Sequence, residues 1–205
     1  MKKGFFVTFE GGDGCGKSTQ VEWLQKYLEQ KKIPCVVTEE PGGTLLGREI
    51  KSLLLDHRFG KLIPTAELLL FAAARAQHVE ELIAPSLAKG KCVVSSRFAD
   101  ATTVYQGMAR GLDLKLIAEL AQVATKGLKP DITFLLDIDP EVGLKRKGKA
   151  DKIEAEGIPF QKKVRAGYLQ LAKQEPHRFF VISGSLSIEE IHQKIVTQFH
   201  SKLKL

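Results

Sequence analysis

The feature that most constrains this sequence is a glycine-rich loop that directly follows an apolar run. Residues 5–9 (FFVTF) are almost wholly apolar, and residues 11–18 (GGDGCGKS) satisfy the pattern G-x-x-x-x-G-K-[ST]. The pattern predicts a strand, a loop and the start of a helix, in that order. The backbone N–H groups of such a loop wrap phosphates at the positive end of the helix dipole. The sequence therefore predicts a nucleotide-binding site near the start of the chain.

Two side chains of this loop are expected to act on the nucleotide directly. The ammonium group of Lys17 would lie against the outer phosphate oxygens. The hydroxyl of Ser18 would bind a Mg²⁺ ion whose other ligands are mostly water and phosphate. The residues expected to contact the nucleotide are Gly11, Gly12, Asp13, Gly14, Cys15, Gly16, Lys17, Ser18 and Thr19.

Strand-like and helix-like segments alternate along the chain. Strands are expected at residues 5–9, 35–38, 91–95, 131–137 and 179–182. Helices are expected at residues 17–32, 44–55, 64–87 with a disturbance at Pro85, 101–106, 112–126, from Pro140, 160–173 and 187–199. Ser187 and Glu190 form a capping box for the last of these helices. This order predicts a three-layer α/β/α fold with a five-stranded parallel sheet and ligands beyond the carboxyl ends of its strands.

The composition narrows the class of protein. The 205 residues are enough for one domain with its own core, and no apolar run approaches the roughly 20 residues that span a membrane. Cys15, Cys35 and Cys92 lack metal-ligand spacing and fit a reducing compartment, so a cytoplasmic protein is expected.

The net charge of +7 indicates a polyanionic partner, either nucleic acid or a small phosphorylated ligand. Residues 145–165 contain eight basic and three acidic residues. A solvated basic helix face would explain that segment equally well.

The phosphate loop alone does not define a reaction, because GTPases, transport ATPases, helicases and small-molecule kinases share it. The sequence lacks the guanine-binding pattern N-K-x-D and is short for a transporter or helicase. Arginines just after strands and a late basic loop favour a kinase whose lid excludes water, the competing phosphoryl acceptor.

Further motifs resemble those of the thymidylate kinase family in their order and spacing, over essentially the whole chain. They are residues 10–14 (EGGDG), 40–44 (EPGGT), 70–75 (LFAAAR), 97–98 (RF), 105–107 (YQG) and 134–146 (FLLDIDPEVGLKR). The resemblance implies a single P-loop kinase domain over residues 1–205 with the P-loop NTPase fold and a short lid at about 146–157. It also implies transfer of the γ-phosphoryl group of ATP, with Mg²⁺, to dTMP, giving dTDP for dTTP biosynthesis. A homodimer that binds neither nucleic acid nor membrane is expected.

The resemblance also implies an acceptor site. Phe71 and Arg75, four residues apart on one helix face, would stack on the pyrimidine and donate to a base carbonyl. Arg97 would bind the acceptor phosphate with its forked guanidinium. From the residues alone, a core Phe beside a surface Arg, and a strand-end salt bridge at Arg97, remain open. The full set expected to bind the acceptor is Asp13 at the 3′ hydroxyl, Tyr105 at the 2′ side, Thr102 near the base, Glu40, Phe71, Arg75, Arg97 and Gln106.

The cations expected to stabilise the transferring phosphoryl group are Lys17, Arg97, Arg146 and Arg165. Asp137 ends a strand and either orients a metal-bound water or has a structural role.

The sequence departs from the family pattern at three positions. Glu39 stands where the family commonly has Arg, Ser96 where it has Asp, and Ala101 where it has Ser. We expect the fold and the reaction to be retained, with altered metal handling or reduced turnover. Another nucleoside or nucleoside monophosphate kinase, and a non-catalytic protein that binds nucleotides or nucleic acid, are the alternatives.

Overall fold

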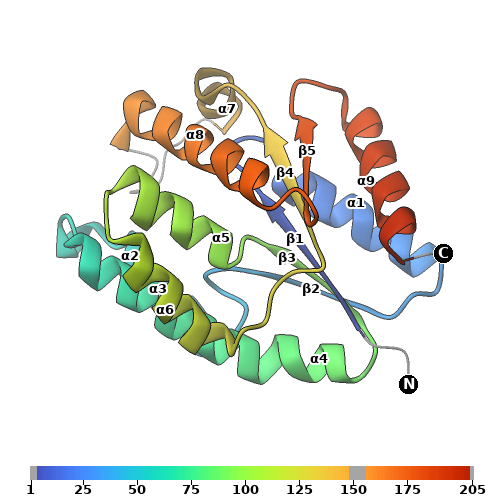
Figure 1. The fold of residues 1–205 in the computed structure, drawn as a ribbon, viewed down its shortest axis with the longest axis horizontal. Coiled ribbons are helices and arrows are strands. Elements are labelled where there is room, and N and C mark those ends of the chain that lie inside the picture. The colour runs from blue at the N-terminus through green and yellow to red at the C-terminus, as the bar shows by residue number, and fades with distance from the viewer. Residues whose placement is uncertain (1–3, 148–155, 204–205) are drawn as a thin grey trace.

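A five-stranded, wholly parallel sheet forms the centre of the computed structural model, which describes residues 4–147 and 156–203 (Figure 1). The strand order is β2-β3-β1-β4-β5. The strands are β1 (Phe5–Glu10), β2 (Cys35–Glu39), β3 (Cys92–Ser96), β4 (Ile132–Asp137) and β5 (Phe179–Ser183). The predicted α/β fold with five parallel strands is confirmed.

Helices cover both faces of this sheet, which gives three layers. α1 (Lys17–Gln30) and α9 (Ile188–Leu203) pack together on one face (Figure 1). The elements on or beyond the other face are α3 (Pro64–His78), η2 (Val79–Ile83), α4 (Ala84–Ala88), α5 (Ala99–Thr102), η3 (Thr103–Ala109), α6 (Leu114–Thr125) and α8 (Ile158–Gln174). Three elements lie further out: α2 (Leu45–Leu55) packs on α3, α7 (Pro140–Lys147) packs on α8, and η1 (His57–Phe59) is a 3₁₀ turn. In the described part of the chain, no helix combines the length and the hydropathy of a membrane span.

Side chains of β1 contribute to the core on both faces of the sheet. Phe9 packs with the α1 and α9 side chains Leu24 and Phe199. Phe6 points the other way and meets the ring of Phe98 edge-on, with 4.9 Å between ring centroids. Both phenylalanines are fully buried. The central strands therefore read as continuous apolar runs, because neither face of the sheet meets solvent.

The sheet brings the ends of three strands together at one place. Ser96 of β3 is in register with Phe9 of β1 and with Glu39 of β2. The helices that follow the adjacent strands β1 and β3 lie on opposite faces of the sheet, α1 on one face and α5 on the other. Ligands of open α/β sheets bind beyond the carboxyl ends of the strands at such a point.

The disturbance expected at Pro85 in the helix over residues 64–87 is confirmed, because the π-helical turn η2 interrupts that helix just before the proline. Proline lacks an N–H and its ring crowds the carbonyl four residues earlier, so a wider turn accommodates it.

The helix expected over residues 101–106 begins at Ala99 and widens into the π-helix η3, which continues to Ala109. Asp100 in its first turn accepts two 2.7 Å hydrogen bonds from the guanidinium of Arg178. This long-range ion pair explains a start that sequence periodicity does not indicate.

The predicted capping box of α9 is confirmed. The Ser187 N–H donates to Glu190 Oε2 over 2.9 Å, and the Glu190 N–H donates to Ser187 Oγ over 3.2 Å. Thr44 caps α2 with a side-chain bond alone, because its hydroxyl accepts from the Gly47 N–H over 3.0 Å.

Candidate functional site

A cavity of about 740 Å³ opens beyond the carboxyl ends of β1, β2 and β3. The residues predicted to bind phosphate, base and sugar converge on it from separate parts of the chain. Those that line it are Asp13, Gly14, Cys15, Gly16, Lys17, Ser18, Thr19, Glu40, Phe71, Arg75, Arg97, Thr102, Tyr105, Gln106 and Arg146. Phe71 and Arg97 thus share one cavity with the loop residue Gly16, which a transfer between two bound phosphates requires.

The phosphate loop leads directly into α1, which begins at Lys17. The first N–H groups of a helix have no intrahelical partner and attract anions. Gly16 has φ 96° and Gly14 has φ 69°, a region that side chains rarely adopt. A Cβ atom on Gly14 would also lie 1.9 Å from the carbonyl oxygen of Gly143 on α7. Gly14 is therefore required by packing between the loop and α7, as well as by its backbone conformation.

The ammonium group of Lys17 lies over the same loop. Its Nζ donates to the carbonyl oxygens of Gly11 over 3.0 Å and Gly12 over 2.8 Å. Burial lowers the pKa of Lys17, and the positive charge of Arg97 lowers it further. The lysine is thus held at the phosphate end of the cavity.

The opposite wall is formed by Arg97, directly after β3. Its φ of 69° is a strained conformation for a residue with a side chain and costs about 1–3 kcal/mol. The backbone N–H of Arg97 donates to Phe9 O over 2.9 Å, and Ser95 Oγ donates to Arg97 O over 2.7 Å. These bonds fix the turn in which the guanidinium projects into the cavity.

The guanidinium of Arg97 also links the two walls of the site. Its Nη2 donates to Asp13 Oδ1 over 2.7 Å and to the Tyr105 hydroxyl over 3.3 Å. Asp13 belongs to the phosphate loop and Tyr105 to η3. The salt bridge that remained open for Arg97 is therefore present, and its partner is a residue of the phosphate loop.

Beneath Arg97, the fully buried carboxyl of Glu10 holds the start of the next helix. It accepts from the Phe98 N–H over 2.8 Å and from the Tyr168 hydroxyl over 2.7 Å. Burial raises the pKa of Glu10 to about 7, with a further contribution from the negative charge of Asp100.

We expect this carboxyl to make stability depend on pH. The native state holds a proton on Glu10 that the unfolded chain releases above its ordinary pKa of 4.5, so this contribution is complete below pH 4.5 and is lost as pH rises through about 7. In urea unfolding, the stability of Glu10→Gln relative to the unmodified protein should be up to about 3 kcal/mol more favourable at pH 8 than at pH 5. Parallel pH profiles for the two proteins would contradict this assignment.

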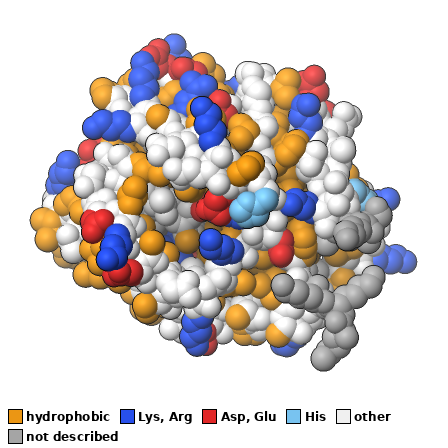
Figure 2. Space-filling view, viewed as in Figure 1, with side chains coloured by type: hydrophobic (Ala, Val, Ile, Leu, Met, Phe, Trp, Pro, Cys, Tyr) orange, Lys and Arg blue, Asp and Glu red, His pale blue; other side chains and the backbone are white. Residues whose placement is uncertain are grey.

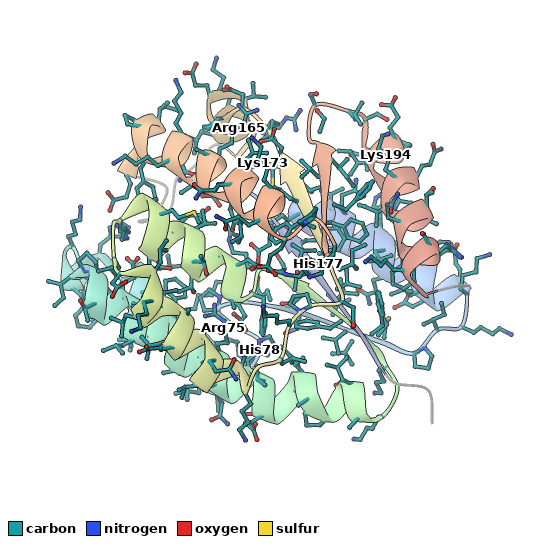
Figure 3. All side chains as sticks on the ribbon, viewed as in Figure 1. Arg75, His78, Arg165, Lys173, His177 and Lys194 are labelled. Atoms are coloured by element: carbon teal, nitrogen blue, oxygen red, sulfur yellow. The ribbon has the colours of Figure 1, made fainter. Side chains whose placement is uncertain are left out.

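Arg75 and His78 lie side by side on α3, and Arg75 lines the part of the cavity where the base is predicted to bind (Figure 3). Arg75 Nε donates to Glu40 Oε2 over 2.8 Å, and Arg75 Nη2 donates to Phe98 O over 3.1 Å. The other oxygen of Glu40 lies 3.0 Å from His78 Nδ1. Glu40, which is predicted to bind substrate, lines the cavity. Both of its carboxylate oxygens are in hydrogen-bond contact with other side chains, one with Arg75 and the other with His78.

Three predicted site residues do not line this cavity. Gly11, Gly12 and Arg165 border a separate small cleft on the α8 side of the phosphate loop. Arg165 makes a bidentate ion pair with Asp137, over 2.7 and 2.9 Å, and Figure 3 shows it near α7, away from Arg75. The catalytic role of Arg165 stays a prediction. The ion pair with Arg165 agrees with a structural role for Asp137, one of the two roles predicted for it. Most of the predicted lid, residues 148–155, lies outside the described residues.

Other cavity residues escaped the sequence analysis. α2 contributes Lys51, whose Nζ lies 2.7 Å from Glu39 Oε1, and the turn after β5 contributes Gly184, whose carbonyl accepts from Arg146 over 3.0 Å. The rule that ligands lie beyond strand ends could have indicated the β5 turn. No local signal marks Lys51.

The fold and the cavity define a P-loop nucleotide-binding protein in which Arg97 faces the phosphate loop across one cavity. A sequence model of the thymidylate kinase family matches residues 9–195. The chain belongs to the thymidylate kinase family.

Named relatives agree with this assignment. The thymidylate kinase of Desulfosudis oleivorans is 51% identical over 201 residues, covering 93% of this chain and 94% of that protein. The thymidylate kinase of Caldanaerobacter subterraneus subsp. tengcongensis is 46% identical, covering 98% of each chain. The crystal structure of thymidylate kinase from Ehrlichia chaffeensis superposes with a TM-score of 0.80 at 35% identity, covering 97% of this chain and 99% of that one. The predicted family is confirmed.

Proposed function

We propose that this chain is a single-domain kinase that transfers the γ-phosphoryl group of ATP to dTMP, giving dTDP. The observation that carries the proposal is the shared cavity: the phosphate loop forms one wall, and Arg97 with Phe71 and Arg75 forms the wall facing it. Two phosphorylated ligands bound to these walls would meet end to end.

The chemistry requires positioning more than proton transfer. The acceptor phosphate is already an anionic nucleophile, so an oxygen of dTMP attacks the γ-phosphorus and ADP leaves, without a side-chain base. Arg97 would hold the attacking phosphate, and Lys17 and Arg146 would neutralise the charge on the donor. Phe71 would stack on the thymine while Arg75 donates to its O4.

The residues present fit a Mg²⁺ ion bound mainly by the substrates. Ser18 lines the cavity at the start of α1, and its hydroxyl would bind the ion. Within residues 4–147 and 156–203, no cluster of three or more His, Cys, Asp or Glu side chains could hold a metal. Phosphate oxygens and water would complete the shell, where the ion neutralises phosphate charge.

An acceptor panel tests this function. Purified protein with Mg-ATP should phosphorylate dTMP far faster than dUMP, dCMP or AMP, measured by formation of ADP and of each nucleoside diphosphate. Equal turnover of all four acceptors would defeat the thymidylate assignment and favour a broader nucleoside monophosphate kinase.

The charge distribution on one face of the molecule favours small-molecule substrates. On the face shown in Figure 2, Lys and Arg side chains are interspersed with Asp and Glu and do not gather into one basic surface. Binding to nucleic acid by phosphate contacts depends on such a surface.

The departures from the family pattern lie at the site itself. Ser96, Ala101 and Glu39 all line the cavity, and Glu39 is paired with Lys51. Ser96 offers a hydroxyl where the family commonly has a carboxylate, so a weaker grip on the metal and slower turnover than in the relatives are part of the proposal.

A homodimer through helices that flank the sheet is also proposed. α3 and α6 pack against each other and expose large apolar side chains, among them Leu69 (51% exposed), Leu116 (41%) and Val123 (76%). Apolar patches of this kind mark protein interfaces.

We expect Val123→Asp to halve the particle mass measured by light scattering, because it would place a charge in the interface. Phe59→Asp, which changes an exposed apolar side chain in η1 (52% exposed), should leave the mass unchanged. The same mass for all three proteins would exclude this interface.

A further inference from the structure

Behind the base-binding wall lies an ion pair between Glu67 on α3 and Arg110, the residue that follows η3. Arg110 Nε donates to Glu67 Oε1 over 2.8 Å, and Arg110 Nη2 donates to Glu67 Oε2 over 3.0 Å. Glu67 is only 6% exposed. A bidentate pair of this geometry fixes the carboxylate in place and leaves both of its oxygens as hydrogen-bond acceptors.

The same carboxylate binds the side-chain amide of Gln106, a residue of the cavity wall. Gln106 Nε2 donates to Glu67 Oε1 over 2.6 Å, and the side chain is 2% exposed. An oxygen that already accepts from Arg110 requires a donor in this position, so the NH₂ group of the amide must face Glu67. The amide then has its carbonyl oxygen left to offer to a ligand in the cavity.

We infer that Glu67, held by Arg110, is a positioning residue that makes Gln106 select an acceptor base carrying a hydrogen on ring nitrogen N3. This inference rests on the proposed function and adds a residue with no assigned role. Thymine and uracil present an N3–H donor, which a fixed amide carbonyl accepts. Cytosine presents a lone pair at N3, which the same carbonyl repels. A freely rotating amide would serve both bases equally, because it can offer either a donor or an acceptor.

Replacing Glu67 by glutamine removes the constraint while keeping the size of the side chain. The glutamine side chain has one acceptor oxygen where the glutamate had two. Its NH₂ group replaces the other oxygen and would face an N–H donor of either Arg110 or Gln106, with which it cannot form a hydrogen bond. Gln106 is then free to turn its NH₂ group towards the cavity, where it can donate to N3 of a cytosine.

The test measures kcat/KM for dTMP and for 5-methyl-dCMP, which keeps the methyl group and differs only along the base edge. We expect the preference for dTMP to fall about tenfold or more in Glu67→Gln, the loss of one base-edge contact. Arg75, which would read position 4 of the base, is unchanged, so a change in the ratio reports on Gln106. The matched control is Glu175→Gln, which disrupts a different Glu–Arg pair, with Arg178, and should preserve the ratio.

A second variant separates positioning from general damage to the fold. Gln106→Met removes the amide and should lose the preference to the same extent, and the double variant should lose no more than Gln106→Met alone, because Glu67 acts through Gln106. Two outcomes would overturn the inference. In the first, the double variant loses dTMP preference by the product of the losses in the two single variants. In the second, Gln106→Met keeps the full preference for dTMP. The measurement on Gln106→Met tests the inference even if Glu67→Gln does not fold.

Failure of this inference can be distinguished from failure of the proposed function. An unmodified protein that fails the acceptor panel removes the proposed function. An unmodified protein that passes the panel but does not distinguish dTMP from 5-methyl-dCMP removes only the selection by Gln106. An unmodified protein that does distinguish them, with a Glu67→Gln variant that keeps the ratio, removes only the role of Glu67.

Discussion

Lys17→Ala is expected to lower kcat about 10³-fold with saturating ATP and dTMP. The lysine is the cation of the phosphate loop, and a fixed cation at a transferring phosphoryl group contributes on this scale because it stabilises charge in the transition state. Its Nζ already lies within hydrogen-bond distance of two loop carbonyls, so it needs little reorganisation to reach a phosphate bound by the same loop.

The matched control is Lys26→Ala on the same helix. Lys26 is exposed and pairs only with the neighbouring Glu22 among the contacts resolved for it, so kcat should change by less than twofold. A Lys17→Ala enzyme with full activity would defeat the catalytic assignment of the loop.

Arg97→Ala is expected to lower kcat/KM for dTMP about 10³-fold, with little change in KM for ATP. The variant loses the forked donor for the acceptor phosphate and the bond that joins Asp13 to the facing wall. Arg97→Lys should recover only part of the loss, because lysine supplies charge without the planar fork. A change confined to KM for ATP would place Arg97 at the donor instead.

Backbone strain provides a second measurement at this position. Arg97→Gly should be about 1 kcal/mol more stable than Arg97→Ala in urea unfolding, since glycine adopts a φ of 69° without a steric penalty. Equal stability of the two variants would show that the turn relaxes when the side chain is removed.

The parts of the molecule that the sequence predicts are those with local signals. The phosphate loop and the five strands are contiguous patterns, and the α9 capping box involves residues three apart. Phe71 and Arg75 share a helix face by simple periodicity, and the structure places both at the cavity.

The parts that sequence reasoning missed depend on contacts between distant residues. Glu10 is predicted only as part of the EGGDG motif, yet its carboxyl accepts from Tyr168, which is 158 residues away. Glu67 meets Arg110 across 43 residues, and nothing in the periodicity of either segment indicates the pair. The sequence predicts Arg165 as a cation for the transferring phosphoryl group, but no local pattern shows that Asp137 pairs with its guanidinium.

The pairing of Ser96 with Phe9 in the sheet has a consequence for how this enzyme family can change. The phosphate loop follows β1 and Arg97 follows the adjacent strand β3. The distance between these two proposed phosphate sites is therefore set by the backbone ladder between the strands, which side-chain substitutions barely alter. The residues proposed to contact the base come instead from α3 and η3, outside that ladder. New acceptor nucleotides are therefore reachable by mutation at the periphery while the distance for phosphoryl transfer stays constant.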